Sequence, residues 1–272
     1  MESIDVSVII TTRNEEKHIK NCLESITKQT YPQDRIEAIV VDNNSTDKTK
    51  EIALTYTSKV YNFGPERSAQ RNQGIRQAQG KYILYLDADM RLSPGVIKEC
   101  VDKCESCGYI ALYIPERIIG EGFWVKVRDF ERGFYTATCI DAVRFVRKDK
   151  FLETGGFDET LTGPEDWDFD RRIKQIGKVD IIDSPIYHNE GKFNFRKYLK
   201  KKNYYAADFK KYIGKWGNGD IIIKKQFGFW YRYFAVFAKE EKITKFLLHP
   251  ALSLGMILLR FTVGLSYIIS KK

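Results

Sequence analysis

The sequence predicts an α/β protein in which a mostly parallel, Rossmann-like sheet is flanked by helices and followed by a C-terminal helical extension. Short apolar segments alternate with segments of helical periodicity along the first half of the chain, an order that is typical of parallel sheets. Polar and acidic residues directly follow several of the apolar segments, where such sheets bind their ligands. With 272 residues, 43% of them hydrophobic, the chain is long enough for one substantial core and an appendage.

The expected strands are short apolar runs, and the expected helices carry apolar residues on one face or begin with a capping signal such as Ser93-Pro94. The strands are placed at residues 6–10, 36–41, 59–61, 82–86 and 179–183. The helices are placed at residues 15–28, 47–56, 68–79, 93–108 and 167–176. These elements predict a domain at residues 1–191, with halves at 1–92 and 93–191, and an extension at residues 192–272.

Polar loops follow three of the expected strands. They are residues 11–15 after the first strand, residues 42–47 after the second, and Asp87-Ala88-Asp89 after the strand at 82–86. The carboxyl ends of parallel strands meet at one edge of a sheet, so these loops are expected to converge there. An isolated pair of acids is weak evidence in a chain with 36 acidic residues, but packing of the core does not require three such loops. No Gly-x-Gly-x-x-Gly motif follows the first strand and there is no Walker loop, which disfavours a dinucleotide or P-loop fold.

In their order along the chain, these motifs resemble those of a glycosyltransferase family 2 enzyme with the GT-A fold. The likeness runs from residue 6 to residue 190. Its first half matches the family's Pro-Thr-Tyr-Asn-Glu opening, its Asp-Asp-Gly-Ser-Thr-Asp loop and its Ala-Arg-Asn-x-Gly segment at residues 11–16, 41–47 and 67–74. Its second half matches the Gly-Gly-Phe-Asp-Glu motif and the Glu-Asp pair of the acceptor half at residues 155–159 and 165–168.

The resemblance implies a nucleotide-binding site in the first half. Asp42 is expected to accept a hydrogen bond from N3–H of uracil, and Asn44 lies in the same loop. Arg67 and Arg71 are expected to neutralise a diphosphate, because guanidinium groups match phosphate oxygens. The alternative for both arginines is an exposed helix charge. A loop around the base and ribose and two residues after the strand at 82–86 complete the expected site. They are Thr11, Thr12, Arg13 and Glu15 in the loop, and Asp87 and Ala88 after the strand.

A divalent metal is expected beside the nucleotide. Asp89 is expected to bind the ion directly, and Asp87 is expected to contact the ribose or a metal-bound water. Hard carboxylate oxygens suit Mg²⁺ or Mn²⁺. His188, one of three histidines, lies where the resemblance implies a further ligand, and an imidazole favours Mn²⁺. A purely structural histidine is the alternative.

Asp166 is the expected catalytic base, with Glu165 as the second candidate. Inverting transfer requires a carboxylate that takes the proton of the acceptor hydroxyl, and the N-terminus of a helix can hold such an acid. The alternative is that Asp166 only caps its helix. Gly163-Pro164 departs from the family's commoner Gly-Glu or Gly-Gly, which leaves the register of the base open between these two acids.

Cys100, Cys104 and Cys107 have a C-x3-C-x2-C spacing that resembles the cluster motif of radical S-adenosylmethionine enzymes. A helix at 93–108 would place all three on one stripe, and small buried cysteines on a face that packs against a sheet are the ordinary explanation. Five cysteines without a secretion signal indicate reduced thiols.

The C-terminal extension is strongly basic. Residues 192–272 carry 18 Lys and Arg against four Asp and Glu, whereas residues 1–191 carry 27 against 32. Aromatic residues crowd the segment 226–237, a composition typical of the membrane interface. Residues 247–269 form a mostly apolar stretch that is long enough to span a bilayer, although Arg260 near its middle disfavours a simple span. A spanning helix, an in-plane interfacial helix and a helix packed on the catalytic domain are the three alternatives.

Together these observations predict a metal-dependent inverting glycosyltransferase. It would move a sugar from a nucleotide sugar, expected to be UDP-linked, to a hydroxyl of a lipid-linked saccharide in surface polysaccharide or glycan assembly. Polyprenyl-phosphate glycosyltransfer is the second candidate, and a nucleotidyltransferase or a non-catalytic membrane adaptor are more distant ones. Its expected location is the cytoplasmic face of the cell membrane, as a peripheral, monotopic or single-pass protein, since no secretory signal precedes the first strand.

The expected partners are the nucleotide-sugar donor, the lipid-linked acceptor and an anionic membrane surface. Nucleic acid is not expected, and a homo-oligomer is left open. The donor sugar is expected to contact the region of residues 113–142, which the sequence does not resolve further. Acceptor contact or plain surface charge are the two alternatives for Glu116, Arg117, Arg128, Arg132 and Arg144.

Overall fold

A seven-stranded sheet forms the centre of the part of the chain that precedes the C-terminal extension. The computed structural model describes residues 3–238 and 240–269. The strand order is β3-β2-β1-β4-β8-β6-β9, and all neighbours are parallel except the two pairs that include β8. This confirms the predicted mostly parallel α/β sheet. Its strands are β1 (Val6–Thr12), β2 (Ile36–Asp42), β3 (Val60–Asn62), β4 (Tyr82–Asp87), β6 (Ala111–Tyr113), β8 (Phe145–Arg147) and β9 (Val179–Ile181).

Two hydrophobic clusters cover the two faces of this sheet. Alternate residues of β1 point to opposite faces, so Val8 and Ile10 belong to one cluster and Ile9 to the other. On the first face lie α1 (Ile19–Thr27), α2 (Thr49–Leu54) and α4 (Val96–Cys107). On the second face lie α3 (Arg67–Gln77), α6 (Lys148–Glu153) and α7 (Glu165–Ile176). The sheet is thereby buried on both sides, which explains its continuous apolar strands.

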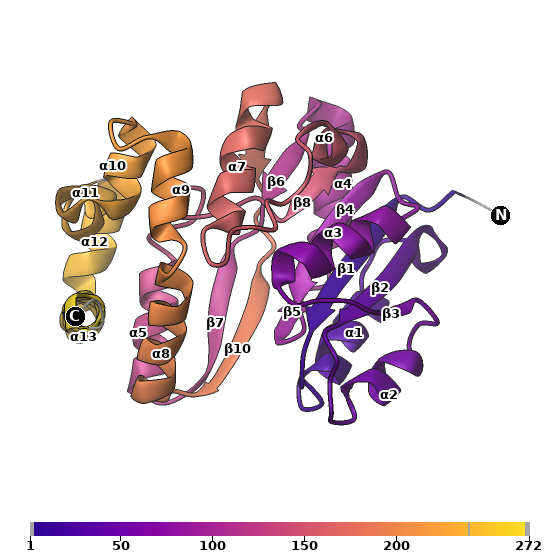
Figure 1. Cartoon of the computed structure of the whole chain (residues 1–272), viewed down its shortest axis with the longest axis horizontal. Coiled ribbons are helices and arrows are strands. Elements are labelled where there is room, and N and C mark those ends of the chain that lie inside the picture. The colour runs from indigo at the N-terminus through magenta and orange to yellow at the C-terminus, as the bar shows by residue number, and fades with distance from the viewer. Residues whose placement is uncertain (1–2, 239, 270–272) are drawn as a thin grey trace.

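A second, three-stranded sheet with the order β5-β10-β7 lies beside the first (Figure 1). Its central strand β10 (Ile186–Lys192) runs antiparallel to β5 (Met90–Leu92) and parallel to β7 (Glu116–Glu121). Helix α5 (Phe123–Arg132) packs against β7. Because β5 follows directly after β4, this small sheet holds β10 next to the carboxyl end of β4.

The C-terminal extension is helical, as predicted, and lies on the side of the molecule away from the N-terminal half (Figure 1). Helix α13 packs against α5 and α8, and its Met256 and Leu259 are buried there. The helices are α8 (Phe195–Ala206), α9 (Phe209–Trp216), α10 (Ile221–Phe227), α11 (Phe229–Tyr233), α12 (Glu240–Leu248) and α13 (Pro250–Ile269). Two short 3-10 turns, Gln33–Arg35 and Ala235–Phe237, complete the assignment.

The expected single apolar segment at 247–269 is divided by a bend. Helix α12 ends at Leu248 and α13 begins at Pro250, where the proline cannot continue the preceding helix. Within the part of the chain that the structure describes, no single helix has the length and hydropathy to cross a membrane. The pair Lys242–Leu248 and Pro250–Ser266, bent by 104°, meets these criteria jointly.

Several expected boundaries shift, and one expected stripe is wrong. The helix expected at 15–28 begins only at Ile19, because the polar residues before it form a loop. Gly108 ends α4 as expected, with the left-handed φ of 71° that suits glycine. Cys100 and Cys104 are buried, but Cys107 is exposed at the end of the helix, so the three cysteines do not share one buried stripe. Burial raises the pKa of the Cys100 thiol well above its usual value.

Candidate active site

The ends of three strands of the large sheet lie side by side. In the register of the parallel pairs, Thr12 of β1 faces Asp42 of β2, and Thr11 of β1 faces Asp87 of β4. The Thr11 hydroxyl donates to Asp87 Oδ1 at 3.1 Å, and the backbone N–H of Ala88 donates to the Thr11 carbonyl. The structure thus brings together the polar loops that were expected to converge.

The loops after β1 and β2 are locked to each other. Asn14 has a left-handed φ of 54°, and its side-chain oxygen accepts a hydrogen bond from the backbone of Thr46 at 2.8 Å. The backbone N–H of Asn14 in turn donates to Ser45 Oγ at 2.7 Å. Arg13 is exposed beside this junction. Two loops held in this way form a rigid rim at the edge of the sheet.

Asp42 is 2% exposed, and its carboxylate accepts two hydrogen bonds from Ser45, one from the backbone N–H and one from the hydroxyl. A carboxylate has about four lone-pair positions, so acceptor capacity remains for a further donor. The side chain of Asn44 is paired with Asn62, which ties the β2 loop to β3. The base contact of Asp42 and the nucleotide contact of Asn44 stay predictions.

Asp87 is surrounded by cationic groups. Arg67 Nη1 lies 3.3 Å from Asp87 Oδ2, and Arg71 Nη2 lies 3.1 Å from Asp87 Oδ1. Burial opposes ionisation, but the two guanidinium groups outweigh it and hold the pKa of Asp87 well below its usual range. With both oxygens engaged in the described structure, Asp87 is an anion that orients its neighbours, and its predicted contact to ribose or metal stays a prediction.

Arg71 is not the exposed helix charge that was one of its two alternatives. It is 1% exposed, and its guanidinium is enclosed by the rings of Tyr85 and Phe157 at 4.8 and 5.2 Å. Its Nη1 lies 2.6 Å from Asp166 Oδ1 while its Nη2 holds Asp87, and its Nε is buried without a hydrogen-bond partner. Arg71 therefore joins a carboxylate at the end of β4 to a carboxylate of α7, and its expected contact with a diphosphate stays a prediction.

The two candidate bases have different environments. Glu165 is 1% exposed, one of its oxygens accepts from Arg67 at 3.1 Å, and the other is buried without a partner. Burial and the neighbouring charge of Asp166 raise the pKa of Glu165. The Asp166 side chain is 25% exposed and therefore accessible to a substrate. The N-cap position of α7 is Pro164, and no side chain caps it, so the helix-capping alternative for Asp166 is wrong.

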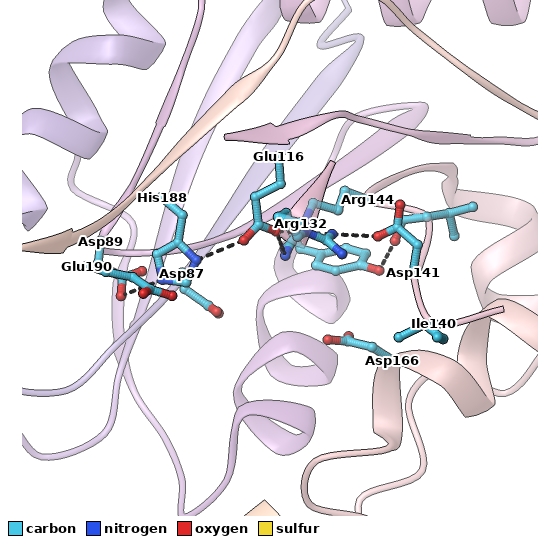
Figure 2. Close-up of polar contacts among 12 residues, drawn as sticks. Asp87, Asp89, Glu116, Arg132, Ile140, Asp141, Arg144, Asp166, His188 and Glu190 are labelled. Atoms are coloured by element: carbon cyan, nitrogen blue, oxygen red, sulfur yellow. Dashed lines mark hydrogen bonds and ion pairs between the residues drawn. The ribbon is translucent and has the colours of Figure 1, made fainter. Parts of the chain in front are cut away.

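His188 lies on β10 between two carboxylates (Figure 2). Its Nε2 is 3.1 Å from Asp89 Oδ2, and its Nδ1 is 2.9 Å from Glu116 Oε1. Burial alone would lower the pKa of His188, but the hydrogen bonds to Asp89 and Glu116 raise it to about 10. The chain thus places His188 next to Asp89, 99 positions earlier, as the resemblance implied.

The donor set of this region fits a divalent ion. The structure describes no group of three or more His, Cys, Asp or Glu side chains arranged to hold a metal. It does show a buried oxygen of Asp89, Oδ1, without any hydrogen-bond partner, next to a carboxylate–histidine pair. Mg²⁺ and Mn²⁺ sites often use only one or two protein ligands and complete their shell with water and substrate phosphates. Asp89 and His188 are the residues that would hold the ion, and Glu116 would orient the imidazole.

Glu116 is not the surface charge that was one of its two alternatives, and its contact with an acceptor stays a prediction. It is 7% exposed and also lies 3.2 Å from Arg132 and 3.1 Å from Arg144. Arg132 extends the chain of contacts to Asp141 at 2.6 Å (Figure 2). Burial opposes ionisation, but Arg132 and His188 keep the pKa of Glu116 well below its usual value. Of the five charged residues in that group, Arg117 is the exposed one, with a side-chain exposure of 59%.

Two lysines of α8 were not among the predicted site residues. Burial, reinforced by the charge of Asp89, raises the pKa of Glu15 to about 7, while Lys197 and Lys201 act in the opposite direction. Both ammonium groups therefore lie within electrostatic range of Glu15, in the loop after β1. The signal in the sequence is their i,i+4 spacing on a basic helix that follows β10 directly.

Solved structures share this architecture, which is the GT-A fold. The mannosyltransferase PcManGT from Pyrobaculum calidifontis, solved with GDP-Man and Mn²⁺, matches 99% of this chain and 86% of its own with a TM-score of 0.65 and 20% identity. Residues 1–349 of TarS from Staphylococcus aureus, solved with UDP-GlcNAc, match 98% of this chain and 92% of that chain with a TM-score of 0.60 and 19% identity. At these identities the likeness establishes the fold.

The chain belongs to glycosyl transferase family 2. The sequence pattern of this family matches residues 7–158, which are more than half of the chain. The uncharacterized glycosyltransferase MJ1057 of Methanocaldococcus jannaschii is 31% identical over 224 residues, which cover 74% of this chain and 76% of the relative. Glycosyltransferase AglE of Haloferax volcanii is 43% identical over 91 residues, 31% of this chain. The chain spans 30% of AglE and 18% of the full TarS protein in these alignments.

Proposed function

We propose that this protein is an inverting glycosyltransferase that moves a sugar from a nucleotide sugar to a hydroxyl of a lipid-linked saccharide. The observation that carries the proposal is the position of Arg71, which holds Asp87 beside the metal-binding residues and Asp166 beside the open acceptor side with one guanidinium. Donor and acceptor chemistry would therefore meet within the reach of a single side chain. Such an arrangement serves a direct displacement at one carbon atom.

In this mechanism Asp166 accepts the proton of the acceptor hydroxyl as that oxygen attacks the anomeric carbon. Arg71 keeps Asp166 oriented through the hydrogen bond from its Nη1, and an oriented carboxylate is what a general base requires. Glu165 would remain buried behind it, bound to Arg67. Attack from the face opposite the departing nucleotide inverts the configuration at the sugar.

The donor half would hold the nucleotide diphosphate. A divalent ion held by Asp89 and His188 would supply Lewis-acid neutralisation of the leaving diphosphate. Lys197 and Lys201 lie close enough to this edge to add positive charge, and Asp42 would read the base. TarS was solved with UDP-GlcNAc and PcManGT with GDP-Man and Mn²⁺, which supports a nucleotide-sugar donor and a divalent metal for this chain. A uracil base is proposed because Asp42 retains acceptor capacity.

The acceptor is proposed to be carried by a lipid at the cytoplasmic face of the membrane. Helices α11, α12 and α13 expose large apolar side chains on the outer side of the extension, among them Trp230, Leu248, Leu254 and Leu258 at 71, 69, 68 and 56% exposure. The extension around them is strongly basic. Apolar side chains with a basic surround are suited to the interface of an anionic bilayer. Polyprenyl phosphate is the second acceptor candidate, since a phosphate attacks without a strong base.

The proposal is tested by separating donor binding from transfer. We expect UDP with Mn²⁺ to raise the thermal stability of the wild type, because a ligand that binds only the folded state stabilises it. In Asp166→Asn we expect the same stabilisation but transfer to the lipid-linked acceptor slowed by about 10²- to 10⁴-fold. Asp149→Asn, an exposed acid on α6, is the matched control.

Each outcome has a defined meaning. Full transfer by Asp166→Asn would exclude Asp166 as the base, and a wild type without any UDP response would exclude the donor assignment. Release of pyrophosphate instead of a nucleoside diphosphate would indicate a nucleotidyltransferase. Transfer to polyprenyl phosphate but not to the lipid-linked saccharide would favour the second acceptor. Extraction by detergent but not by carbonate or high salt would support the membrane location over binding to nucleic acid.

A further inference from the structure

We propose that α5, α8, α11 and α13 together form a binding site for the phosphate group of the lipid that carries the acceptor. The inference rests on the proposed function and names the part of the acceptor that this region would hold. Its basis is a cluster of charged groups between these helices in which positive charge exceeds negative charge. The cations are Arg128 on α5, Lys202 on α8, Arg232 on α11 and Arg260 on α13, and the carboxylates are Glu131 on α5 and Glu190 on β10.

Two of the four cations form ion pairs with the two carboxylates. Arg128 lies 2.8 Å from Glu131 and 3.0 Å from Glu190. Arg260 lies 3.1 Å from Glu131 and also donates to the Tyr135 hydroxyl and to the carbonyl of Arg232. Arg260, which disfavoured a simple membrane span, is therefore 9% exposed and bound within the protein.

The other two cations form no ion pair with a carboxylate in the described structure. The ammonium of Lys202 lies 5.4 Å from the centre of the Tyr198 ring, and the guanidinium of Arg232 lies 5.6 Å from the centre of the Tyr135 ring. Glu131 acts on both only as a more distant charge, and Arg232 Nη1 is buried without a hydrogen-bond partner. Burial, reinforced by the charge of Arg128, lowers the pKa of Lys202 to about 8. Half-buried cations without ion-pair partners cost free energy, which an anion of two negative charges would recover.

A phosphate fits this cluster better than another anion. Guanidinium and ammonium groups match its oxygens, and no carboxylate lies at ion-pair distance from Lys202 or Arg232 in the described structure. The diphosphate of the donor is proposed to bind at a different place, the sheet edge at Asp89 and His188. Glu190 of the cluster is two residues from His188 on β10, so a phosphate here would lie at the acceptor side of that edge.

The position of the cluster argues for a lipid. On α13 the buried Arg260 lies between Leu258 and Phe261, which are 56% and 47% exposed. On α11 Arg232 is flanked by the exposed aromatic side chains of Trp230 and Phe234. The cations thus lie beneath an outer apolar surface. A ligand with a phosphate head and a hydrocarbon chain would satisfy both layers at once, which a free inorganic phosphate would not.

The experiment measures binding of farnesyl phosphate and of uncharged farnesol to the detergent-solubilised full chain, without donor. We expect Lys202→Met and Arg232→Gln each to weaken binding of farnesyl phosphate by at least tenfold while binding of farnesol stays unchanged. Lys200→Met, an exposed lysine on the same helix, is the matched control and should bind like the wild type. Since neither Lys202 nor Arg232 forms an ion pair in the described structure, both variants should melt at or above the wild-type temperature in the absence of phosphate.

The arms of the experiment separate the sources of phosphate. If the variants lose binding to phosphatidylglycerol vesicles but keep farnesyl phosphate, the site holds a bilayer headgroup and the acceptor assignment is overturned. If binding of farnesyl phosphate and of the vesicles is unchanged in both variants, or if both melt below the wild type, the site itself is overturned. The UDP response is measured in the same samples, so a failure of the proposed donor function is recognised independently of the phosphate result.

Discussion

Among single residues, Glu116 links the histidine beside Asp89 to two arginines. Its carboxylate accepts from His188 and is neutralised by Arg132 and Arg144, so it fixes the orientation of the imidazole that faces Asp89. A carboxylate in this position makes the other ring nitrogen a better metal ligand. The imidazole is therefore held ready by residues that lie outside the sequence motifs.

We expect Glu116→Gln to weaken Mn²⁺ binding by about 10- to 100-fold, because the amide cannot hold the imidazole in the same tautomer and charge state. Electron paramagnetic resonance titration of Mn²⁺ without donor measures this directly. Glu121→Gln, at the exposed end of the same strand, is the control. A folded Glu116→Gln variant with unchanged Mn²⁺ affinity would contradict the orienting role.

Lys202 predicts a dependence of stability on pH. Its pKa of about 8 in the folded protein is below the value of about 10.4 for an unfolded lysine. Between these pH values the unfolded chain binds a proton that the folded chain has released, so this residue makes the free energy of unfolding rise with pH. We therefore expect Lys202→Met to be more stable than the wild type at pH 7, with the difference shrinking towards pH 10.4. Urea denaturation across this range measures it, and a constant difference would argue against the buried ammonium.

The role of Arg71 was beyond prediction from the sequence for a physical reason. The Ala-Arg-Asn-like context correctly marked the residue, but its function depends on Asp166, 95 positions away along the chain. Local pattern indicates that a residue type is unusual, whereas burial and partners are set by how distant segments pack. The same applies to Glu116, whose partners Arg132, Arg144 and His188 come from other elements of the fold.

At the scale of elements, the longer apolar runs were predicted as strands, whereas the short strands β5, β6 and β8 and the more polar strands β7 and β10 were not. The residues Ile186–Lys192 include His, Asn, Glu and Gly, and most of them are only half-buried. Such a strand exists because β5 and β7 supply its hydrogen bonds, and that pairing is not visible locally. Consequently the site was predicted at the strand ends of the large sheet. The contribution of the small sheet, which holds His188 and Glu116, was not predicted.

Helix α13 packs closely against α5 at Gly255, where there is no room for a larger side chain. A Cβ added at Gly255 would meet Val127 Cγ2 at 2.8 Å and the Phe123 ring at 3.1 Å, whereas one added at Gly264 would meet only the Tyr233 hydroxyl at 3.7 Å. We expect Gly255→Leu to lower the free energy of unfolding by about 1–3 kcal/mol through overpacking. Gly264→Ala, in the same helix, should raise it by up to about 1 kcal/mol. Chemical denaturation of both variants measures the contrast, and equal effects would contradict close packing at Gly255.

At the scale of the whole molecule, the extension gives the protein two unlike sides. One side of α13 packs on the catalytic domain, and the other exposes a stripe of apolar residues at a spacing of about one helical turn. The mostly parallel sheet and the helical extension were predicted from the sequence. The bend between α12 and α13 was not, although the proline at position 250 was its visible signal.

We expect the double variant Leu254→Gln/Leu258→Gln to bind anionic phosphatidylglycerol vesicles at least tenfold more weakly, because burial of each leucine contributes about 1.5–3 kcal/mol. Both side chains are exposed in the structure, so thermal stability should change little. Vesicle co-sedimentation measures the binding, with Leu54→Gln, an equally accessible leucine of the N-terminal half, as the control. Undiminished sedimentation of the double variant would remove this face from the membrane proposal.

Side chains of helix α3 contact residues that lie beyond position 92 in the sequence, and these contacts limit how such chains can recombine. Arg67 pairs with Glu165, Arg71 with Asp166, and Asn72 with the backbone of Phe157. A chimera that takes residues 1–92 from one family member and the rest from another would inherit these partners from different parents. Exchange of donor specificity by module swapping is therefore restricted to parents that keep the same three contacts, and the two halves are expected to have diversified together.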